Sequence, residues 1–264
     1  MSARHLGHTS TRRKPMKIGL IGVGSIGSTL AKRLPTKGHD VKVANSRGPE
    51  TLDKDLLSTG AQAVTAEEAA TDVDALILSI PLKAMPNLAP LIQALPEETA
   101  VIDTSNYYPK RDDAIEAIEN GQVESEWVVE QLGGRSIVKA WNAVGAEVLA
   151  EEDRQPGDPQ RVAIPVAADD ARAKDIAFTL VNDSGLDPVD AGSLADSWRQ
   201  QPGAPVYGTR LAAAEIPGAL EVAQRDRLPR RRDLTFDIVM DRLDDPTLTI
   251  DAAFMTRLAR ALYL

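Results

Sequence analysis

Residues 17–27 read KIGLIGVGSIG, and this stretch decides the fold of the chain. A short apolar run leads into three glycines with G-x-G-x-x-G spacing, namely Gly22, Gly24 and Gly27. Apolar residues then recur every four positions, as on the buried face of a helix: Ile26, Leu30 and Leu34. The stretch therefore predicts a strand, a tight glycine turn and a helix, which we expect to run from Ser25 to Leu34 and to end or kink at Pro35.

Such a turn is typical of sites that bind the pyrophosphate of a dinucleotide. The first glycine permits the turn, the second lets the phosphates approach the backbone, and the third lets helix and strand pack closely. The exposed amides and the positive dipole end of the helix then face the phosphates. The alternative is a purely structural glycine turn, and the position of these glycines directly after a strand pattern weighs against it.

The segment Asn45-Ser46-Arg47 ends a second predicted strand, Asp40 to Asn45. A protein that binds NAD has an Asp or Glu about 20 residues past the glycines, where it holds the ribose 2′-hydroxyl. A carboxylate there would repel a 2′-phosphate, whereas a hydroxyl and a guanidinium would bind it with charge-assisted hydrogen bonds. Asn45, Ser46 and Arg47 therefore favour NADP over NAD. The alternative is that Arg47 is a solvated surface arginine.

The rest of the chain alternates strand-like and helix-like stretches, which predicts an α/β fold with a doubly wound parallel sheet (Rossmann) and a smaller C-terminal domain. The predicted later strands are 63–64, 75–80, 100–103, 137–141, 161–167 and 187–190. The loops at 79–83 and 104–109 follow strands and should face the cofactor, because ligands bind at the carboxyl ends of such strands. Residues 52–59 look helical, and Phe254, Leu258 and Leu262 indicate a final amphipathic helix for docking or dimer contact.

The sequence suggests three parts. Residues 1–15 are polar and basic, so we expect a disordered arm. Residues 16–150 carry the predicted NADP-binding Rossmann domain, and the polar, proline-containing stretch 151–160 is the best linker candidate. Residues 151–264 would then form a smaller substrate or dimerisation region with an extended tail.

Composition excludes several classes of function. The chain has 264 residues, a net charge of −9 and no cysteine. Disulfides, thiolate metal sites and a cysteine nucleophile are therefore excluded, no metal site is predicted, and a broad nucleic-acid surface is not expected. No apolar run has the length needed to cross a bilayer, and residues 1–15 lack the apolar core of a secretory signal. We expect a cytoplasmic protein that acts on a small molecule.

Proton donors are scarce in the second half of the chain. All three histidines, His5, His8 and His39, precede the second strand, and Lys174 is the one lysine after Lys139. Enzymes that reduce carbonyls with a nicotinamide generally also need a proton donor at the substrate. Three tyrosines could supply it: Tyr107, Tyr108 and Tyr207. An acceptor that delocalises charge, such as a flavin-like ring, would need no acid from the protein.

Three stretches resemble a known family. KIGLIGVGSIG (17–27), ANSRGPE (44–50) and VKAWN (138–142) are similar to the NADPH-dependent coenzyme F420 reductases, the 8-hydroxy-5-deazaflavin:NADPH oxidoreductases. The resemblance is strong over residues 16–145 and weaker to about residue 215. Phe-Asn stands in many members where this chain has Trp141-Asn142.

The resemblance implies direct hydride exchange between NADP(H) and coenzyme F420, without a catalytic acid or base, in a homodimer. It implies that Ser25 and Ile26 donate amides to the pyrophosphate lined by Gly22, Gly24 and Gly27. Ser46 and Arg47 would hold the 2′-phosphate. Four residues would lie against the nicotinamide end: Ile80, Pro81, Asn106 and Ala140.

Two other functions stay open at this point. One is an NADPH-dependent reductase of an imine or carbonyl substrate with Tyr107 or Tyr207 as proton donor. The other is a non-catalytic NADP-sensing Rossmann protein. The same N-terminal signature serves reductases of other substrates, and the last 40 residues resemble no family.

Overall fold

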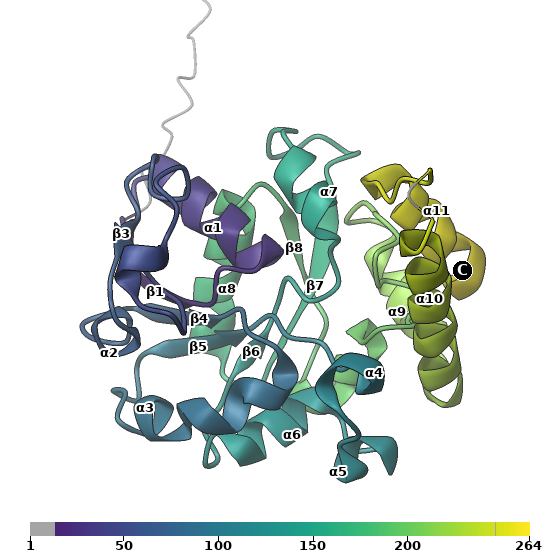
Figure 1. Ribbon diagram of the computed structural model, residues 1–264, viewed down its shortest axis with the longest axis horizontal. Coiled ribbons are helices and arrows are strands. Elements are labelled where there is room, and N and C mark those ends of the chain that lie inside the picture. The colour runs from purple at the N-terminus through teal and green to yellow at the C-terminus, as the bar shows by residue number, and fades with distance from the viewer. Residues whose placement is uncertain (1–13, 246) are drawn as a thin grey trace, which may run out of the picture.

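An eight-stranded sheet forms the centre of the structure, a computed structural model that describes residues 14–245 and 247–264 (Figure 1). Most of the predicted N-terminal arm, residues 1–13, lies outside this range. The strand order is β3-β2-β1-β4-β5-β6-β7-β8. The strands are β1 (Lys17–Ile21), β2 (Asp40–Ala44), β3 (Gln62–Ala63), β4 (Ala75–Leu78), β5 (Ala100–Asp103), β6 (Val138–Lys139), β7 (Ala163–Ala168) and β8 (Asp187–Asp190).

The sheet is mostly parallel. Every neighbouring pair of strands runs parallel except β6 and β7, where Val138 pairs with Ala168 in antiparallel register. The predicted doubly wound α/β fold is confirmed, with β7 and β8 reversed relative to the other strands. Because β1, β4, β5 and β6 are parallel, the loops that follow them meet at one edge of the sheet.

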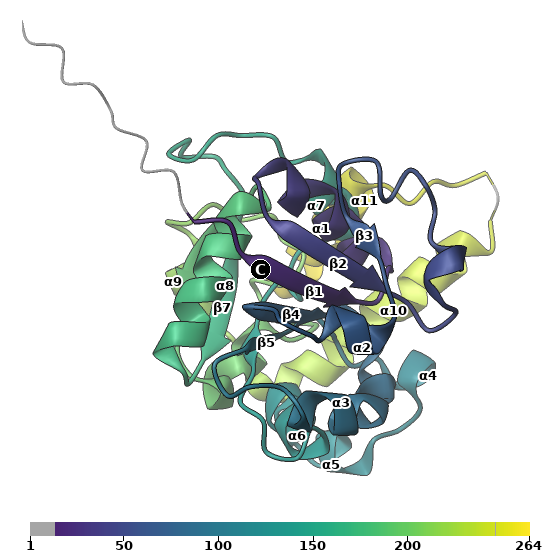
Figure 2. The ribbon, with the colours of Figure 1, turned by 90° about the vertical axis from the view of Figure 1, so that its left-hand side faces the viewer.

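Helices cover both faces of the sheet. In Figures 1 and 2, α3 and α6 lie below the strands, and α1 and α7 lie above them. The helices are α1 (Ser25–Thr36), α2 (Ala66–Ala69), α3 (Ala89–Gln93), α4 (Pro109–Asp112), α5 (Glu116–Glu119), α6 (Glu124–Gln131), α7 (Ala146–Glu151), α8 (Ala171–Asp183), α9 (Ile216–Glu221), α10 (Leu228–Leu243) and α11 (Ala252–Tyr263). Four 3₁₀ helices add to these: η1 (Pro49–Thr51), η2 (Leu82–Leu88), η3 (Leu194–Gln200) and η4 (Arg225–Arg227).

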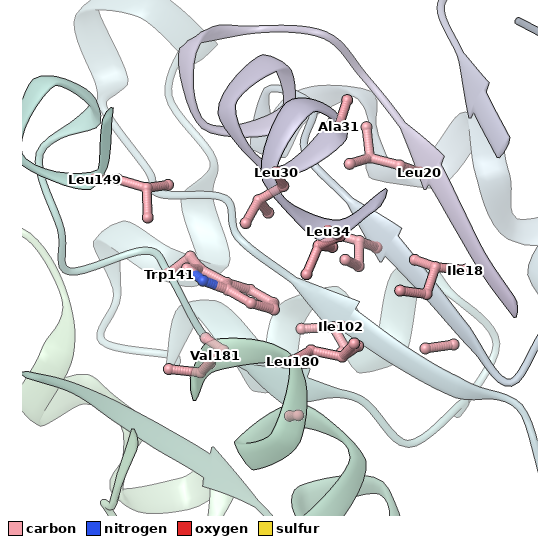
Figure 3. Close-up of a cluster of buried hydrophobic side chains, with 14 of the residues drawn as sticks. Ile18, Leu20, Leu30, Ala31, Leu34, Ile102, Trp141, Leu149, Leu180 and Val181 are labelled. Carbon is pink, nitrogen blue, oxygen red and sulfur yellow. The ribbon is translucent and has the colours of Figure 1, made fainter. Parts of the chain in front are cut away.

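The larger core lies between the sheet and helices α1, α7 and α8 (Figure 3). The indole of Trp141 is completely buried at its centre. The side chains labelled around it come from strands and helices far apart in the sequence: Ile18, Leu20, Leu30, Ala31, Leu34, Ile102, Leu149, Leu180 and Val181. A second core packs α2, α3 and α6 on the opposite face, where Leu76, Leu78, Ile92 and Val128 meet. The two cores fix the sheet from both sides and so position its carboxyl edge.

The chain beyond residue 150 completes the sheet and then forms a helical end. β7 and β8 extend the same sheet, while α9, α10 and α11 stand together to one side of it (Figure 1). A small apolar cluster joins this end to β7 through Ala163, Val206, Leu211 and Leu228. The division into domains at residue 150 stays a prediction. The final amphipathic helix is confirmed as α11, but the sequence did not predict α10.

Two local predictions were wrong. Residues 52–59 form turns instead of a helix, because the Asp53 carboxylate accepts the Asp55 amide at 2.9 Å and this local bond competes with helical hydrogen bonds. The first helix continues through Pro35 to Thr36. The helix ends one residue after Pro35, so the predicted end at Leu34 was two residues too early.

Candidate functional site

The three glycines of the opening turn have three different environments. Gly22 has a φ of +103°, and a Cβ there would lie 2.1 Å from the Ser79 carbonyl oxygen. A Cβ on Gly27 would lie 2.1 Å from the Gly22 carbonyl oxygen. Both positions therefore require glycine, Gly22 for its backbone conformation and Gly27 for the close contact between helix and turn.

Gly24 is different because a Cβ there would meet nothing within 4 Å. Gly24 is exposed and is the N-cap of α1, and no side chain caps this helix. The first amides of a helix have no partner within it, so those of Ser25, Ile26 and Gly27 remain free to bind an anion. The first turn of α1 also contains no acidic residue. This helix start can accept a phosphate group.

The loop after β2 is held in shape by Asn45. The Asn45 amide nitrogen donates to the Thr51 hydroxyl at 2.9 Å, and its oxygen accepts the Arg47 backbone amide at 2.9 Å. Thr51 in turn donates to the Gly48 carbonyl at 2.8 Å. The Asn45 side chain is therefore engaged within its own loop, while Ser46 and Arg47 stay exposed.

A pocket of about 440 Å³ joins this loop to the glycine turn. Seven of the residues predicted from the sequence to bind the cofactor line it: Gly22, Gly24, Asn45, Ser46, Arg47, Ile80 and Pro81. Three residues of η2 also line it: Ala84, Asn87 and Leu88. Among the described residues that line the pocket, Arg47 carries the one formal charge. The pocket is thus apolar along one wall and cationic at the loop after β2.

The other five predicted residues are not in the lining of this pocket. Ser25, Ile26 and Gly27 begin α1, and the Ile26 side chain packs against the larger core. Asn106 and Ala140 follow β5 and β6. Ala140 is completely buried, and its amide donates to the Asp103 carbonyl at 3.2 Å. Asn106 is half-buried and is bonded to Asn142, so the structure brings the ends of β5 and β6 together.

The tyrosines are arranged in two ways. Tyr107 is completely buried, and its hydroxyl accepts the Ile115 amide at 3.0 Å. The hydroxyls of Tyr108 and Tyr207 lie 2.7 Å apart, and the Tyr108 ring contacts Phe236 of α10 with a centroid distance of 6.0 Å. Burial raises the pKa of both Tyr108 and Tyr207. These two hydroxyls therefore keep their protons at neutral pH.

A buried ion pair ties β5 to β6 below the site. The Lys139 ammonium donates to Asp103 at 2.7 Å and to the Ser105 carbonyl at 2.5 Å, and both charged side chains are fully buried. Glu124 of α6 lies nearby, and its carboxyl group accepts the Tyr107 amide at 3.1 Å. Burial raises the pKa of Glu124 to about 7, against the opposing effects of Lys139 and of the Tyr107 amide. The loop that carries Asn106 is therefore anchored by charged groups out of contact with water.

A known protein family matches the part of the chain that contains the glycine turn and the loops after β2 and β4. Residues 17–107 match the family model described as NADP oxidoreductase, coenzyme F420-dependent. The match confirms the resemblance found in the sequence over this part of the chain. It supports NADP-dependent oxidoreduction as the class of activity.

The relatives extend this likeness to the fold. The Escherichia coli protein YjhV is 45% identical over 87 residues, which cover 31% of this chain and 64% of YjhV. A hypothetical protein from Sinorhizobium meliloti is 28% identical, with a TM-score of 0.63, covering 75% of this chain and 96% of that one. A candidate F420-dependent NADP reductase from an Arthrobacter species has 18% identity and a TM-score of 0.55, covering 85% and 95% of the two chains. This chain thus spans less than two thirds of the length of YjhV.

Sequence reasoning missed the side chains that connect the ends of β5, β6 and η3. Gln200 of η3 reaches the Asn142 side chain at 2.9 Å across 58 residues of sequence. No local pattern marks Gln200, because its neighbours in the chain are not its neighbours in the site. Asn142 carried a signal, since it directly follows a predicted strand.

Proposed function

We propose that this chain binds NADPH and transfers hydride between its nicotinamide and coenzyme F420. The pyrophosphate lies on the free amides at the start of α1, beside Gly22 and Gly24. Ser46 and Arg47 bind the 2′-phosphate, and the nicotinamide extends past Ile80 and Pro81 toward Asn106 and Ala140. Asn45 shapes the loop that presents Arg47.

One observation carries this proposal: the pocket joins an open glycine turn to the loop after β2, and the Arg47 guanidinium is the one formal charge among the described residues that line it. A phosphate needs the amides and the cation, and a carboxylate at the end of β2 would oppose it. Residue 45 at the end of β2 is an asparagine. The F420-dependent family model that residues 17–107 match supports the acceptor.

Transfer to a deazaflavin needs alignment and exclusion of water but no acid or base from the protein. We therefore assign no catalytic residue, and we propose a cytoplasmic homodimer with a small-molecule substrate. No helix among residues 14–245 and 247–264 combines the length and the apolar character needed to span a membrane.

A second candidate function is an NADPH-dependent reductase of an imine or carbonyl. The paired hydroxyls of Tyr108 and Tyr207 favour it, because Tyr108 lies two residues after Asn106 in the loop that follows β5. Tyr107 is a poorer candidate than Tyr207, because Tyr107 is completely buried whereas Tyr207 is half-buried. Burial raises the pKa of Tyr107 to about 12.

The test is a mixture of purified protein, NADPH and F420 without oxygen. We expect loss of the 340 nm absorbance of NADPH together with bleaching of oxidised F420. Tyr207→Phe should retain at least half of this activity, since direct transfer uses no proton from a tyrosine. Tight NADPH binding without F420 reduction would contradict the proposed acceptor, and complete loss of turnover in a folded Tyr207→Phe variant would favour the imine or carbonyl reductase. Binding without turnover over a broad range of acceptors would favour a sensing role.

A further inference from the structure

Three carboxamides form a connected chain beside the proposed nicotinamide position. Asn106 Nδ2 donates to the Asn142 carbonyl at 2.9 Å, and Asn142 Nδ2 donates back to Asn106 Oδ1 at 3.2 Å. Gln200 Nε2 donates to Asn142 Oδ1 at 2.9 Å, while Asn142 Nδ2 also donates to the Gln200 carbonyl at 2.8 Å. The chain links the end of β5 to the end of β6 and to η3.

The members of this chain differ in their access to a ligand. Asn142 and Gln200 are 2% and 0% exposed, whereas Asn106 is half-buried. A carboxamide has two N–H donors and an oxygen with two lone pairs. Asn142 engages one N–H and one lone pair of Asn106. Asn106 therefore retains one donor and one acceptor, which is the complement of another carboxamide, such as that of nicotinamide.

The backbone next to Asn142 is held in an uncommon conformation. Trp141 has a φ of +57°, a region that bulky residues rarely adopt because it strains the backbone. Its indole is fully buried in the larger core and donates to the Ser184 hydroxyl at 3.0 Å (Figure 3). The core on one side of Trp141 thus imposes the turn that sends Asn142 toward Asn106 and Gln200.

The network also reaches β6. Gln200 Nε2 donates to the Lys139 carbonyl at 3.3 Å, and the Lys139 ammonium holds the Ser105 carbonyl next to Asn106. Gln200 Oε1 and the Ser105 hydroxyl are buried without a partner among the described residues. Each buried polar atom without a partner costs free energy.

We infer that Asn142 and Gln200 are positioning residues that orient the Asn106 carboxamide toward the nicotinamide of the bound NADPH without touching the dinucleotide. This inference rests on the proposed NADPH site and is independent of the acceptor. The Asn106 carboxamide limits rotation of the nicotinamide ring and so fixes which carbon faces the acceptor. Misplacement by about 1 Å can reduce a reaction rate about 100-fold without changing the groups that react.

The experiment compares Asn142→Ala, Gln200→Ala and Asn106→Ala with an exposed control, Gln160→Ala. Calorimetry gives the Kd of NADPH, and fluorescence anisotropy of the reduced nicotinamide reports how firmly the ring is held. We expect each of the three variants to keep the NADPH Kd within about threefold, because the phosphates supply most of the affinity. Ring anisotropy should fall, and single-turnover hydride transfer to F420 should slow at least about tenfold. Gln160→Ala should match the wild type in all three measurements.

A double variant tests whether Asn142 acts through Asn106. Asn106→Ala combined with Asn142→Ala should be no worse than Asn106→Ala alone, since residues that act as one unit are not additive. If Gln200→Ala does not fold, Gln200→Met keeps the volume and removes the hydrogen bonds. Three results would overturn the inference. The rate losses of Asn106→Ala and Asn142→Ala could add in the double variant, Asn142→Ala could keep the ring anisotropy of the wild type, or a variant could lose NADPH affinity and transfer rate to the same extent. If the wild type binds NADPH but does not reduce F420, the acceptor proposal fails while the anisotropy still tests the positioning residues.

Discussion

Glu124 shows at the scale of one residue how the site affects stability. Its carboxyl group is buried beside the Lys139–Asp103 pair and accepts the amide of Tyr107. Burial raises its pKa to about 7 from the ordinary 4.5. Between these two values the folded protein holds a proton that the unfolded chain has lost, so stability falls as the pH rises from about 4.5 to about 7.

We predict that Glu124→Gln removes this loss. By linkage, the difference between the two pKa values corresponds to about 3 kcal/mol of unfolding free energy. The wild type has this contribution below about pH 4.5 and has lost it above about pH 7. Urea unfolding at pH 5 and pH 8 measures it, and the variant should lose less stability between the two values than the wild type. Glu126→Gln, on the exposed face of the same helix, is the matched control and should behave as the wild type. If the unfolding free energy of Glu124→Gln and of the wild type depended on pH in the same way, the Glu124 carboxyl group would have the same pKa in the folded and unfolded protein, which would contradict the prediction.

Single residues also mark the limit of sequence reasoning. Ser46 and Arg47 could be predicted because their position relative to the glycines is fixed by the local strand-turn-helix unit, and both line the pocket. Gln200 could not, because it reaches Asn142 only after η3 packs against the sheet. Site residues within the local strand-turn-helix unit can be predicted from the sequence, whereas those brought in by tertiary packing, such as Gln200, cannot.

At the scale of elements, the glycines of the turn differ in what surrounds them. Gly24 opens onto free space, whereas a Cβ added at Gly22 or Gly27 would lie 2.1 Å from a backbone oxygen. The spacing G-x-G-x-x-G therefore combines one open position, which we propose faces the phosphates, with two that the packing of β1, α1 and β4 requires. The sequence predicted all three roles from the order of strand, turn and helix. The structure confirms the turn at Gly22 and the close packing at Gly27, and the phosphate contact at Gly24 stays a prediction.

Gly24→Ala and Gly27→Ala should therefore fail in different ways. Gly24→Ala should lower the unfolding free energy by less than about 1 kcal/mol, the usual effect at a helix N-cap, while NADPH binds about tenfold more weakly. Gly27→Ala should cost about 2–3 kcal/mol, because the added methyl group overlaps the backbone of the turn. Thermal unfolding and calorimetry on both variants measure these effects. Equal destabilisation by the two substitutions would contradict the division of roles.

Other elements were harder to predict. Residues 52–59 have a helical composition, yet the side chain of Asp53 caps the local backbone and turns replace the helix. α10 was missed because its exposed face mixes Arg230 with apolar residues such as Leu234 and Met240, so its apolar periodicity is weak. Its contacts are tertiary: Phe236 meets the Tyr108 ring, and Asp237 pairs with Lys110.

At the scale of the whole molecule, one sheet edge collects the ends of β1, β2, β4, β5 and β6. The glycine turn and the loop after β2 form the phosphate side of the pocket, and the Asn106–Asn142–Gln200 chain lies toward β5 and β6. The helical end of α9, α10 and α11 stands beside this edge (Figure 1). We propose that this arrangement holds NADPH along the edge, with the protein aligning it to the hydride acceptor.

The most direct test of this account is the ratio of NADPH to NADH affinity in the wild type and in Arg47→Ala, measured by calorimetry. The wild type should prefer NADPH. Arg47→Ala should weaken NADPH binding about 10- to 100-fold, the range expected when charge-assisted hydrogen bonds to a phosphate are lost, and should change NADH binding by less than about threefold. Equal weakening of both nucleotides, or no preference for NADPH in the wild type, would contradict the assignment of the 2′-phosphate to Arg47.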